Sequence, residues 1–382
     1  MKPSAIRVLI VDDSVVVRQV ISDALKNQEG IEVVAAVSNG RAALERLDEL
    51  KPDLLTLDLE MPEMDGLTLL AELAKRRTRL PVIVFSTLTE HGAKATLEAL
   101  ARGASDYVCK PSGQRSVSAT MEKIRTELVP KIHGLAKRRG LSGPLVQAPA
   151  ASPSPGKPGA AQPKPGAAAR NLGLAVSRVD AVVIGVSTGG PSALADVIPH
   201  LPREVSVPIL IVQHMPPVFT QVLAQRLAGI SLLKVKEAAN HDRLEPGVVY
   251  IAPGDYHMRI HGSPRDARIA LDQSPPENGC RPAIDPLFQS AAQIYGKGLL
   301  AIVLTGVGHD GTKGAGHVRR AAGTVWVQDE TTSVAWGMPS SIVEAGHAQR
   351  VLPLSQISRG IVEAVFSGQT VSVRPKAPHK SS

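Results

Sequence analysis

The stretch "VVIGVSTGGPSA", residues 182–193, runs from an apolar segment into a glycine-rich bend, and it predicts a strand, a tight turn and a helix. Within it, residues 185–189 fit the pattern G-x-S-x-G, in which a sharp strand-to-helix turn exposes a serine for acyl transfer. Similar turns also bind phosphates or simply close a corner. The motif alone leaves these interpretations open, and the surrounding sequence has to decide between them.

Around this stretch, short apolar runs alternate with helical patterns over residues 179–370. We expect strands at Ala181–Gly185, Val207–Gln213, Val248–Ala252, Arg268–Leu271, Leu299–Thr305 and Thr324–Gln328. This alternation predicts a three-layer α/β/α domain built on a doubly wound parallel sheet.

The same alternation occupies the N-terminal third, residues 1–132. The expected strands are Ile6–Val11, Ile31–Val37, Asp53–Leu57, Pro81–Phe85 and Asp106–Val108. Amphipathic stretches such as "GRAALERLDEL" lie between them. Five β–α repeats predict a second doubly wound parallel sheet of the flavodoxin-like kind, with its ligand site at the carboxyl ends of the strands.

The two predicted domains are separated by residues 133–178, which are rich in Pro, Ala and Gly and are expected to form a flexible linker. Residues 371–382 are expected to form a basic flexible tail. The net charge of +8 comes from these two segments, because residues 131–179 hold 8 Lys/Arg and no acid. Residues 1–130 hold 17 Lys/Arg and 19 Asp/Glu, and residues 180–370 hold 15 and 16. Near-neutral folded parts argue against a nucleic-acid partner.

Composition also bears on the cellular compartment. The chain is 43% hydrophobic, but we find no apolar run of the length that a transmembrane helix needs and no secretory signal. Its two cysteines, Cys109 and Cys280, lie far apart and outside any C-x-x-C spacing. This usage indicates a cytoplasmic protein without membrane insertion, disulfide framework or zinc site.

Polar residues follow the predicted strands of the N-terminal domain. They are Asp12, Asp13, Asp58, Thr87 and Lys110, which should meet at one edge of the sheet. Three carboxylates in one pocket repel one another, and a hard divalent cation such as Mg²⁺ relieves that repulsion. A hydroxyl and a lysine beside them match the oxygens of a phosphoryl group. The pattern predicts phosphorylation of a carboxylate, with Asp58 as the acceptor.

In the second domain, a nucleophilic Ser187 needs a base and a carboxylate to orient that base. His214 follows the next strand, and Asp310 follows another strongly apolar strand. His309 is the rival base, but its side chain should point away from that of Asp310 and into solvent. The order Ser, His, Asp differs from the Ser, acid, His order of α/β-hydrolases, so a different fold should carry this chemistry.

The motif "DLEMPEMDG" at 58–66 and "KP" at 110–111 complete a resemblance to response-regulator receiver domains. The resemblance implies that Asp12, Asp13, Asp58 and the backbone carbonyl of Glu60 bind Mg²⁺, that Asp58 is phosphorylated, that Thr87 and Lys110 contact the phosphoryl group, and that Tyr107 is an aromatic switch residue.

The segments "IGVSTGGPSAL", "VQHMP", "RPAIDPLF" and "LTGVGHDGTKGA" resemble the catalytic domain of the chemotaxis protein-glutamate methylesterases. This resemblance implies a triad of Ser187, His214 and Asp310, and an esterase reaction that needs no cofactor. The family usually has methionine where this chain has Val307, whose backbone N–H is implied to help bind the oxyanion. Thr188 matches a hydroxyl beside the nucleophile, although capping of the following helix would equally explain it.

Together the resemblances imply a phosphorylation-activated hydrolase that demethylates glutamate esters, and deamidates glutamines, on the cytoplasmic domains of chemoreceptors. A chemotaxis histidine kinase would supply the phosphoryl group. The main alternative is a phospho-switched binding protein whose esterase domain is inactive or differently specific. A small-molecule esterase of the α/β-hydrolase kind and a DNA-binding response regulator are further alternatives, which chain order and the near-neutral second domain disfavour.

Overall fold

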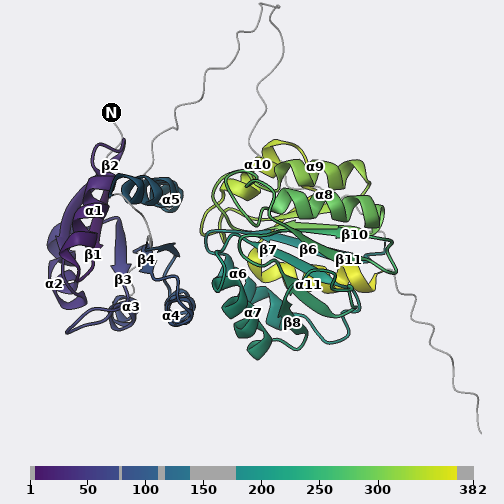
Figure 1. Cartoon of the computed structure of the whole chain (residues 1–382), viewed down its shortest axis with the longest axis horizontal. Coiled ribbons are helices and arrows are strands. Elements are labelled where there is room, and N and C mark those ends of the chain that lie inside the picture. The colour runs from purple at the N-terminus through teal and green to yellow at the C-terminus, as the bar shows by residue number, and fades with distance from the viewer. Residues whose placement is uncertain (1–4, 77–79, 111–116, 138–177, 368–382) are drawn as a thin grey trace, which may run out of the picture.

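The structure is a computed structural model that describes residues 5–76, 80–110, 117–137 and 178–367. These residues form two units, which lie side by side in Figure 1: the N-terminal unit, up to residue 137, and the C-terminal unit, from residue 178. Most of the predicted linker, residues 138–177, and all of the predicted tail, residues 371–382, lie outside the described residues.

The N-terminal unit alternates strands and helices in the predicted order. Its elements are β1 (Ile6–Val11), α1 (Val15–Leu25), β2 (Ile31–Val37), α2 (Gly40–Leu50), β3 (Leu54–Asp58), α3 (Gly66–Lys75), β4 (Val82–Ser86), α4 (Glu90–Ala101), β5 (Asp106–Cys109) and α5 (Val117–Lys137). The five strands are all parallel, in the order β2-β1-β3-β4-β5. Both faces are covered, because Val8 and Ile10 pack with α1 and α5, whereas Leu9 packs with α2, α3 and α4.

The C-terminal unit is a larger α/β fold. Its elements are β6 (Ala181–Val186), α6 (Gly190–Val197), β7 (Ile209–Gln213), α7 (Phe219–Ile230), β8 (Lys234–Glu237), β9 (Val248–Ile251), β10 (His257–His261), β11 (Arg268–Asp272), α8 (Ile284–Tyr295), β12 (Leu299–Val303), α9 (Thr312–Arg320), β13 (Thr324–Gln328), α10 (Gly337–Glu344), β14 (Arg350–Leu352) and α11 (Leu354–Phe366), with short 3₁₀ turns at Ile198–His200 and Gly296–Gly298. Seven parallel strands form its sheet, in the order β14-β13-β12-β6-β7-β9-β8.

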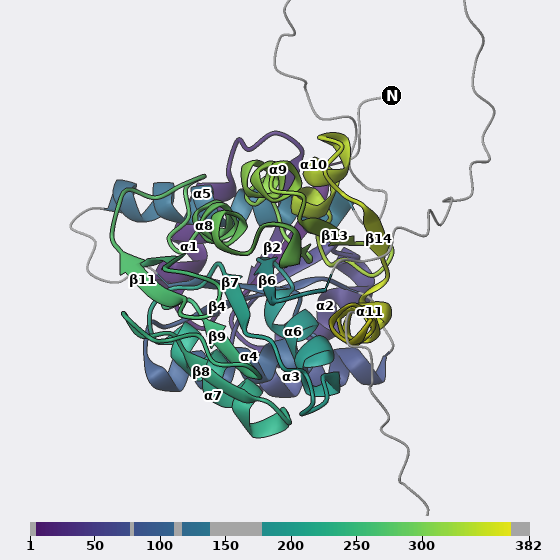
Figure 2. The same ribbon diagram turned by 90° about the vertical axis from the view of Figure 1, so that its right-hand side faces the viewer.

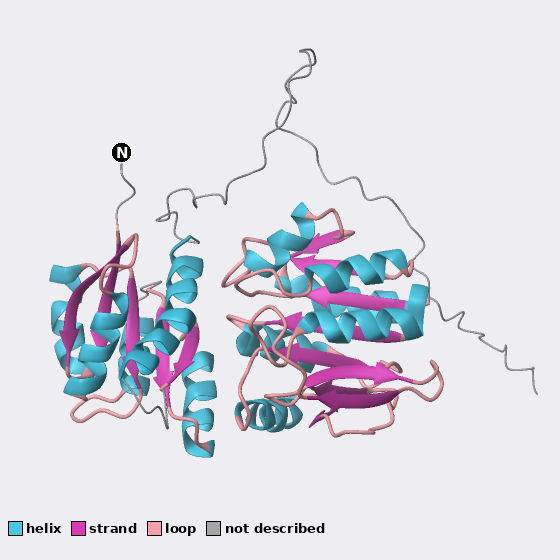
Figure 3. Ribbon diagram, turned by 45° about the horizontal axis from the view of Figure 1, so that its top comes forward, coloured by secondary structure: helices cyan, strands magenta, loops and turns pink. Residues whose placement is uncertain are grey.

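This sheet is buried on both faces, as its almost continuous apolar strands predict. Val183 of β6 packs with α8, α9 and α10, whereas its neighbours Val182 and Ile184 pack with α6, α7 and α11. Figure 2 shows the first group of helices above the sheet and the second group below it, and Figure 3 shows the same layering by secondary structure. The expected fold class, two parallel-sheet α/β units, is confirmed.

The strand predictions were wrong or incomplete at the margins of the C-terminal unit. β11 was expected, but it pairs antiparallel with β10 in a separate two-stranded hairpin. β8, β10 and β14 were not predicted, because they are short, and β8 ("KVKE") and β10 ("HMRIH") carry too many charged or polar residues to resemble buried strands. No helix within the described ranges combines the length and the apolar character needed to cross a bilayer.

Candidate functional site

The carboxyl edge of the N-terminal sheet gathers two acidic residues that follow β1 and one that ends β3. Asp12, Asp13 and Asp58 each place a carboxylate oxygen within 4.8 Å of the other two. Lys110, which follows β5, lies with its Nζ 2.7 Å from Asp58 Oδ2 and 3.4 Å from Asp12 Oδ2. Thr87, which follows β4, lines the same cavity of about 220 Å³ together with Asp13, Asp58, Glu60 and Lys110. The structure therefore brings together the side chains that were predicted to meet here.

The electrostatics of this cavity leave room for a cation. Asp12 is buried, and its Oδ2 has no hydrogen-bond partner within the described part of the chain. Burial and the nearby charge of Asp58 raise the pKa of Asp12. Burial opposes the charged form of Lys110, but its hydrogen bond and ion pair with Asp58 outweigh that effect and raise its pKa. The single ammonium group of Lys110 thus leaves the charge of the three carboxylates only partly compensated. Carboxylate oxygens of this kind suit a hard divalent ion.

In the C-terminal unit, Ser187 directly follows the central strand β6, and the tight turn after it requires glycine. Gly189 has a φ of 78°, in the left-handed region, and a Cβ on Gly190 would lie 1.9 Å from Gln213 Oε1. Gln213 in turn donates from Nε2 to the Ser187 carbonyl at 3.0 Å. On the other side, a Cβ on Gly306 would lie 2.9 Å from Ser187 Cβ. Close backbone packing thus fixes the place of the serine.

His214 and Asp310 form the predicted base–acid pair at the same edge. His214 follows β7, the neighbour of β6, so it comes directly after the register pair Val186–Gln213. Its Nε2 lies 2.8 Å from Asp310 Oδ2, and Asp310 is only 3% exposed. His309 is exposed, as the alternation with Asp310 predicts. The histidine and the aspartate that were predicted from their places after two apolar strands do meet.

The charge state of this pair follows from its hydrogen bonds. Burial favours the neutral acid, but hydrogen bonds from His214, from the Ile284 backbone and from Asn278 outweigh it and lower the pKa of Asp310. Burial likewise disfavours the imidazolium, yet the bonds to Asp310 and Cys280 raise the pKa of His214 to about 10. Both shifts favour the imidazolium–carboxylate form of this pair.

The bond between nucleophile and base is not formed. Among the described residues, no hydrogen bond joins Ser187 to His214, whose Nδ1 instead faces Cys280 Sγ at 3.6 Å. Sequence reasoning treated Cys280 only as an indicator of compartment and missed its place beside the base. Its nearness to the motif "RPAIDPLF" was the only signal in the sequence.

The turn after Ser187 is also tied to the N-terminal unit. Thr188 donates from Oγ1 to Asp106 Oδ2 at 2.7 Å, and Lys131 Nζ lies 2.8 Å from the same oxygen. Thr188 does not cap α6, because the N-cap position is Gly189 and no side chain bonds there. The capping alternative for Thr188 is therefore wrong. Asp106 was missed as a functional residue, although a charged residue in a short apolar strand was a detectable signal.

Apolar contacts extend this interface. Tyr107 of β5 is buried, and its ring stacks on that of Phe219 at the start of α7, with centroids 5.0 Å apart and planes within 8°. A Cβ on Gly134 of α5 would lie 2.8 Å from Val307 Cγ2, so this helix packs directly on the loop of Val307. In Figure 1, α4 and α5 occupy the side of the N-terminal unit that faces the C-terminal unit. The described conformation places the N-terminal unit over the turn that carries Ser187.

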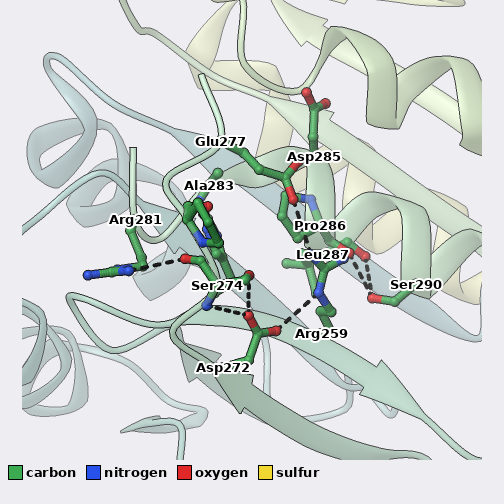
Figure 4. Close-up of polar contacts among 12 residues, drawn as sticks. Arg259, Asp272, Ser274, Glu277, Arg281, Ala283, Asp285, Pro286, Leu287 and Ser290 are labelled. Carbon is green, nitrogen blue, oxygen red and sulfur yellow. Dashed lines mark hydrogen bonds and ion pairs between the residues drawn. The ribbon is translucent and has the colours of Figure 1, made fainter. Parts of the chain in front are cut away.

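A loop between β11 and α8 borders the other side of the site. Arg259 reaches from β10 to Asp272 and to Glu277, with nitrogen–oxygen distances of 3.1 Å, and Arg281 donates to the Ser274 carbonyl at 3.1 Å (Figure 4). Arg281 also pairs with Asp255 at 2.6 Å. These contacts hold the loop that presents Asn278 and Cys280 to Asp310 and His214.

Comparison with known families matches both units. The family described as CheB methylesterase matches residues 182–361, and the family described as response regulator receiver domain matches residues 8–122. Two similar proteins are each named protein-glutamate methylesterase/protein-glutamine glutaminase. The one from Nocardioides sp. is 47% identical over 360 residues, which cover 94% of this chain and 94% of the relative. The one from Trichodesmium erythraeum is 42% identical over 359 residues, which cover 94% and 99%.

Among solved structures, the CheB methylesterase catalytic domain of Thermotoga maritima is 46% identical, with a TM-score of 0.48, and the match covers 48% of this chain and 98% of that one. The relatives align over nearly the whole chain, and both family matches fall on the units that carry the two sites. This chain belongs to the CheB methylesterase family and carries a response regulator receiver domain at its N-terminal end.

Proposed function

We propose that this protein is a phosphorylation-activated hydrolase that removes methyl groups from glutamate γ-esters on the cytoplasmic domains of chemoreceptors, and that deamidates selected glutamines there. The observation that carries the proposal is the 2.8 Å bond between His214 and Asp310, two residues that follow the strands on either side of β6, the strand that Ser187 follows. The names of the relatives agree with this chemistry. A cytoplasmic location follows from such a substrate.

In the proposed reaction, Ser187 Oγ attacks the ester carbonyl while neutral His214 takes its proton. Asp310 holds the imidazole ring in place and stabilises the imidazolium that forms. His214 then protonates the departing methanol, or ammonia when the substrate is an amide. Water attacks the acyl-enzyme with His214 again acting as the base, which releases glutamate and restores Ser187.

Val307 is proposed to contribute a backbone N–H to the oxyanion hole. Its loop follows β12 next to Ser187, and its N–H has no hydrogen-bond partner within the described residues. A backbone donor does not depend on the side chain, so valine in place of the usual methionine preserves it. Removing one such donor typically costs about 10²–10³ in kcat.

The N-terminal unit supplies the proposed control. Asp58 accepts a phosphoryl group from a histidine kinase, and Thr87 and Lys110 contact its oxygens. Asp12, Asp13, Asp58 and the Glu60 carbonyl would hold Mg²⁺. A buried Asp12 Oδ2 that has no hydrogen-bond partner among the described residues, within a cluster of three carboxylates, fits that ion. When bound, Mg²⁺ supplies positive charge against the carboxylates and the phosphoryl oxygens.

Phosphorylation is proposed to weaken the contact of the N-terminal unit with the C-terminal unit. In the described state this contact buries Thr188, directly after the nucleophile, and packs α5 on Val307. Receptor segments would then reach Ser187 only when the contact opens. Tyr107, stacked on Phe219 at this contact, is placed to report the state of the phosphorylation site one strand end away.

The test is methanol release from methylated receptor fragments, measured with and without Mg²⁺ and a small phosphodonor. We expect release by the wild type, an increase with phosphodonor, and no release by Ser187→Ala. Ser263→Ala, which removes an exposed hydroxyl in the β10–β11 loop, is the matched control and should behave like the wild type. Phosphorylated wild type that releases no methanol would instead support the phospho-switched binding protein.

A further inference from the structure

Asn278 lies at the rim of the esterase site and contacts two buried acids. Its Nδ2 donates to Asp310 Oδ1 at 2.8 Å and to Asp285 Oδ2 at 2.9 Å. Asp310 is 3% exposed and Asp285 is 5% exposed, whereas Asn278 itself is exposed. Because both partners are acceptors, both hydrogens of the amide are used, and the orientation of the amide group follows from them.

The geometry of the turn could by itself explain why position 278 is an asparagine. Glu277 and Cys280 exchange backbone hydrogen bonds of 3.1 and 2.9 Å, and Asn278 and Gly279 between them have φ values of 53° and 76°. Asn-Gly is the preferred pair for such a two-residue turn. Turn geometry does not, however, require that the side chain reach Asp310.

The contact with Asp310 differs from all the others that this carboxylate makes. Its other donors are the backbone N–H groups of Ile284, Asp285 and Gly311, which are part of the fold, and the imidazole of His214. Asn278 is therefore the one side chain besides His214 that bonds Asp310 within the described residues. It also separates Asp310 from Asp285, whose pKa is raised by burial and by the charge of Asp310.

We propose that Asn278 is a positioning residue of the esterase: its amide holds the Asp310 carboxylate in the orientation that aligns His214 toward Ser187. Bonds to Asp285 and to Asp310 fix the amide on both sides, so the carboxylate cannot rotate without losing a charge-assisted hydrogen bond. This assignment rests on the proposed function, since it assumes that Asp310 orients the base. It predicts an effect on turnover and on the His214 pKa rather than on folding.

The test variant is Asn278→Gly in the full chain, because glycine adopts the left-handed conformation of this turn without strain and removes only the amide. We expect kcat for methanol release to fall about tenfold with KM unchanged, as for an interaction that acts in the transition state. Asn27→Gly is the matched control, since Asn27 is likewise exposed and left-handed, with a φ of 61°, and lies after α1 in the N-terminal unit. It should stay within about twofold of the wild type.

A double-mutant cycle separates positioning from a general loosening of the loop. In an Asp310→Asn background, Asn278→Gly should cause no further loss, because residues that act as a unit are not additive. The same tenfold loss in both backgrounds would overturn the proposal, and so would wild-type turnover in Asn278→Gly.

A measurement that needs no activity keeps the inference testable if the proposed function fails. NMR titration of His214 should show a lower pKa in Asn278→Gly than in the wild type, because a carboxylate that is no longer held in this orientation stabilises the imidazolium less. The ionisable groups that face this pair are Cys280, beside His214, and Asp285, beside Asp310, and Asn278→Gly leaves both in place. An unchanged His214 pKa would overturn the inference. Absence of methanol release from the wild type would count against the proposed function alone.

Discussion

The two sheet edges of this protein have the same architecture, but they differ in how fully their buried carboxylates are hydrogen-bonded and covered. Each places its polar side chains where parallel strands end. The proposed phosphorylation site around Asp58 opens into a cavity of about 220 Å³ and leaves Asp12 Oδ2 without a hydrogen-bond partner among the described residues. At the esterase site, in contrast, Asp310 is enclosed by donors, and the neighbouring turn is covered by the N-terminal unit.

The first edge thus keeps uncompensated negative charge in an open cavity, whereas the second compensates the charge of its buried carboxylate and lies under the N-terminal unit. Excess negative charge around Asp58 favours the binding of a cation, whereas the hydrogen bonds around Asp310 compensate its charge and fix its orientation. The contact formed by Asp106 and Thr188 links the two, because it joins β5 of the first sheet to the residue after Ser187. The following predictions test that contrast.

The largest effect should come from Asp310→Asn, which keeps the shape of the acid but removes its charge. By analogy with other triads, kcat should fall by about 10⁴. The measurement is methanol release at saturating substrate, with circular dichroism to show that the fold persists. Turnover near that of the wild type would remove Asp310 from the triad.

The next largest effect should be a steep pH dependence. His214 must be neutral to accept a proton, and its pKa is raised to about 10, so kcat/KM should rise about tenfold per pH unit from pH 6 to 9. Initial rates corrected with Ser187→Ala for spontaneous ester hydrolysis measure this. Cys280→Ala should move the rise to lower pH, because Cys280 contributes to the raised pKa. A plateau reached by pH 7 in both proteins would contradict the prediction.

Asp58→Asn should remove the whole phosphodonor-dependent increase and leave the basal esterase rate unchanged. The site of modification is lost, while the described contacts of Thr188 with Asp106 do not involve Asp58. Rates with and without phosphodonor and Mg²⁺ provide the measurement. Stimulation that survives in this variant would mean that another residue accepts the phosphoryl group.

The smallest effect should come from the interface. Asp106→Asn removes the ion pair with Lys131 and weakens the bond from Thr188, so the unphosphorylated enzyme should open more often and its basal rate should rise about three- to tenfold. Arg359→Gln, which removes an exposed ion pair with Glu363 within α11 of the C-terminal unit, is the control and should change the rate by less than about twofold. A fall in basal rate in Asp106→Asn would contradict the covering role of the N-terminal unit.

Much of the site was predictable from sequence because each residue follows an apolar strand. Parallel strands bring such residues to one edge of the sheet regardless of the loop conformations. The sequence alone could therefore group Asp12 with Asp58 and Lys110, and Ser187 with His214 and Asp310. Asn278 and Cys280 could not be found this way. They lie in an irregular loop whose path depends on Arg259, Arg281 and their partners.

The strands likewise divide into those that the sequence predicts and those that depend on tertiary packing. Continuous apolar runs such as Val182–Val186 determined the central strands, because only a sheet covered on both faces can bury them. The short edge strands and the β10–β11 hairpin carry polar residues and form where a neighbour supplies hydrogen bonds. Their existence depended on packing that no local pattern encodes.

The sequence by itself therefore determined two α/β units and the residues at their strand ends, since periodicity and strand order are local properties of the chain. Only the tertiary structure decided that Thr188 bonds to Asp106, that Tyr107 stacks on Phe219 and that His214 faces Cys280. Those contacts join residues 66 to 112 positions apart. Their pairing depends on how whole units pack, which strand and helix patterns do not specify.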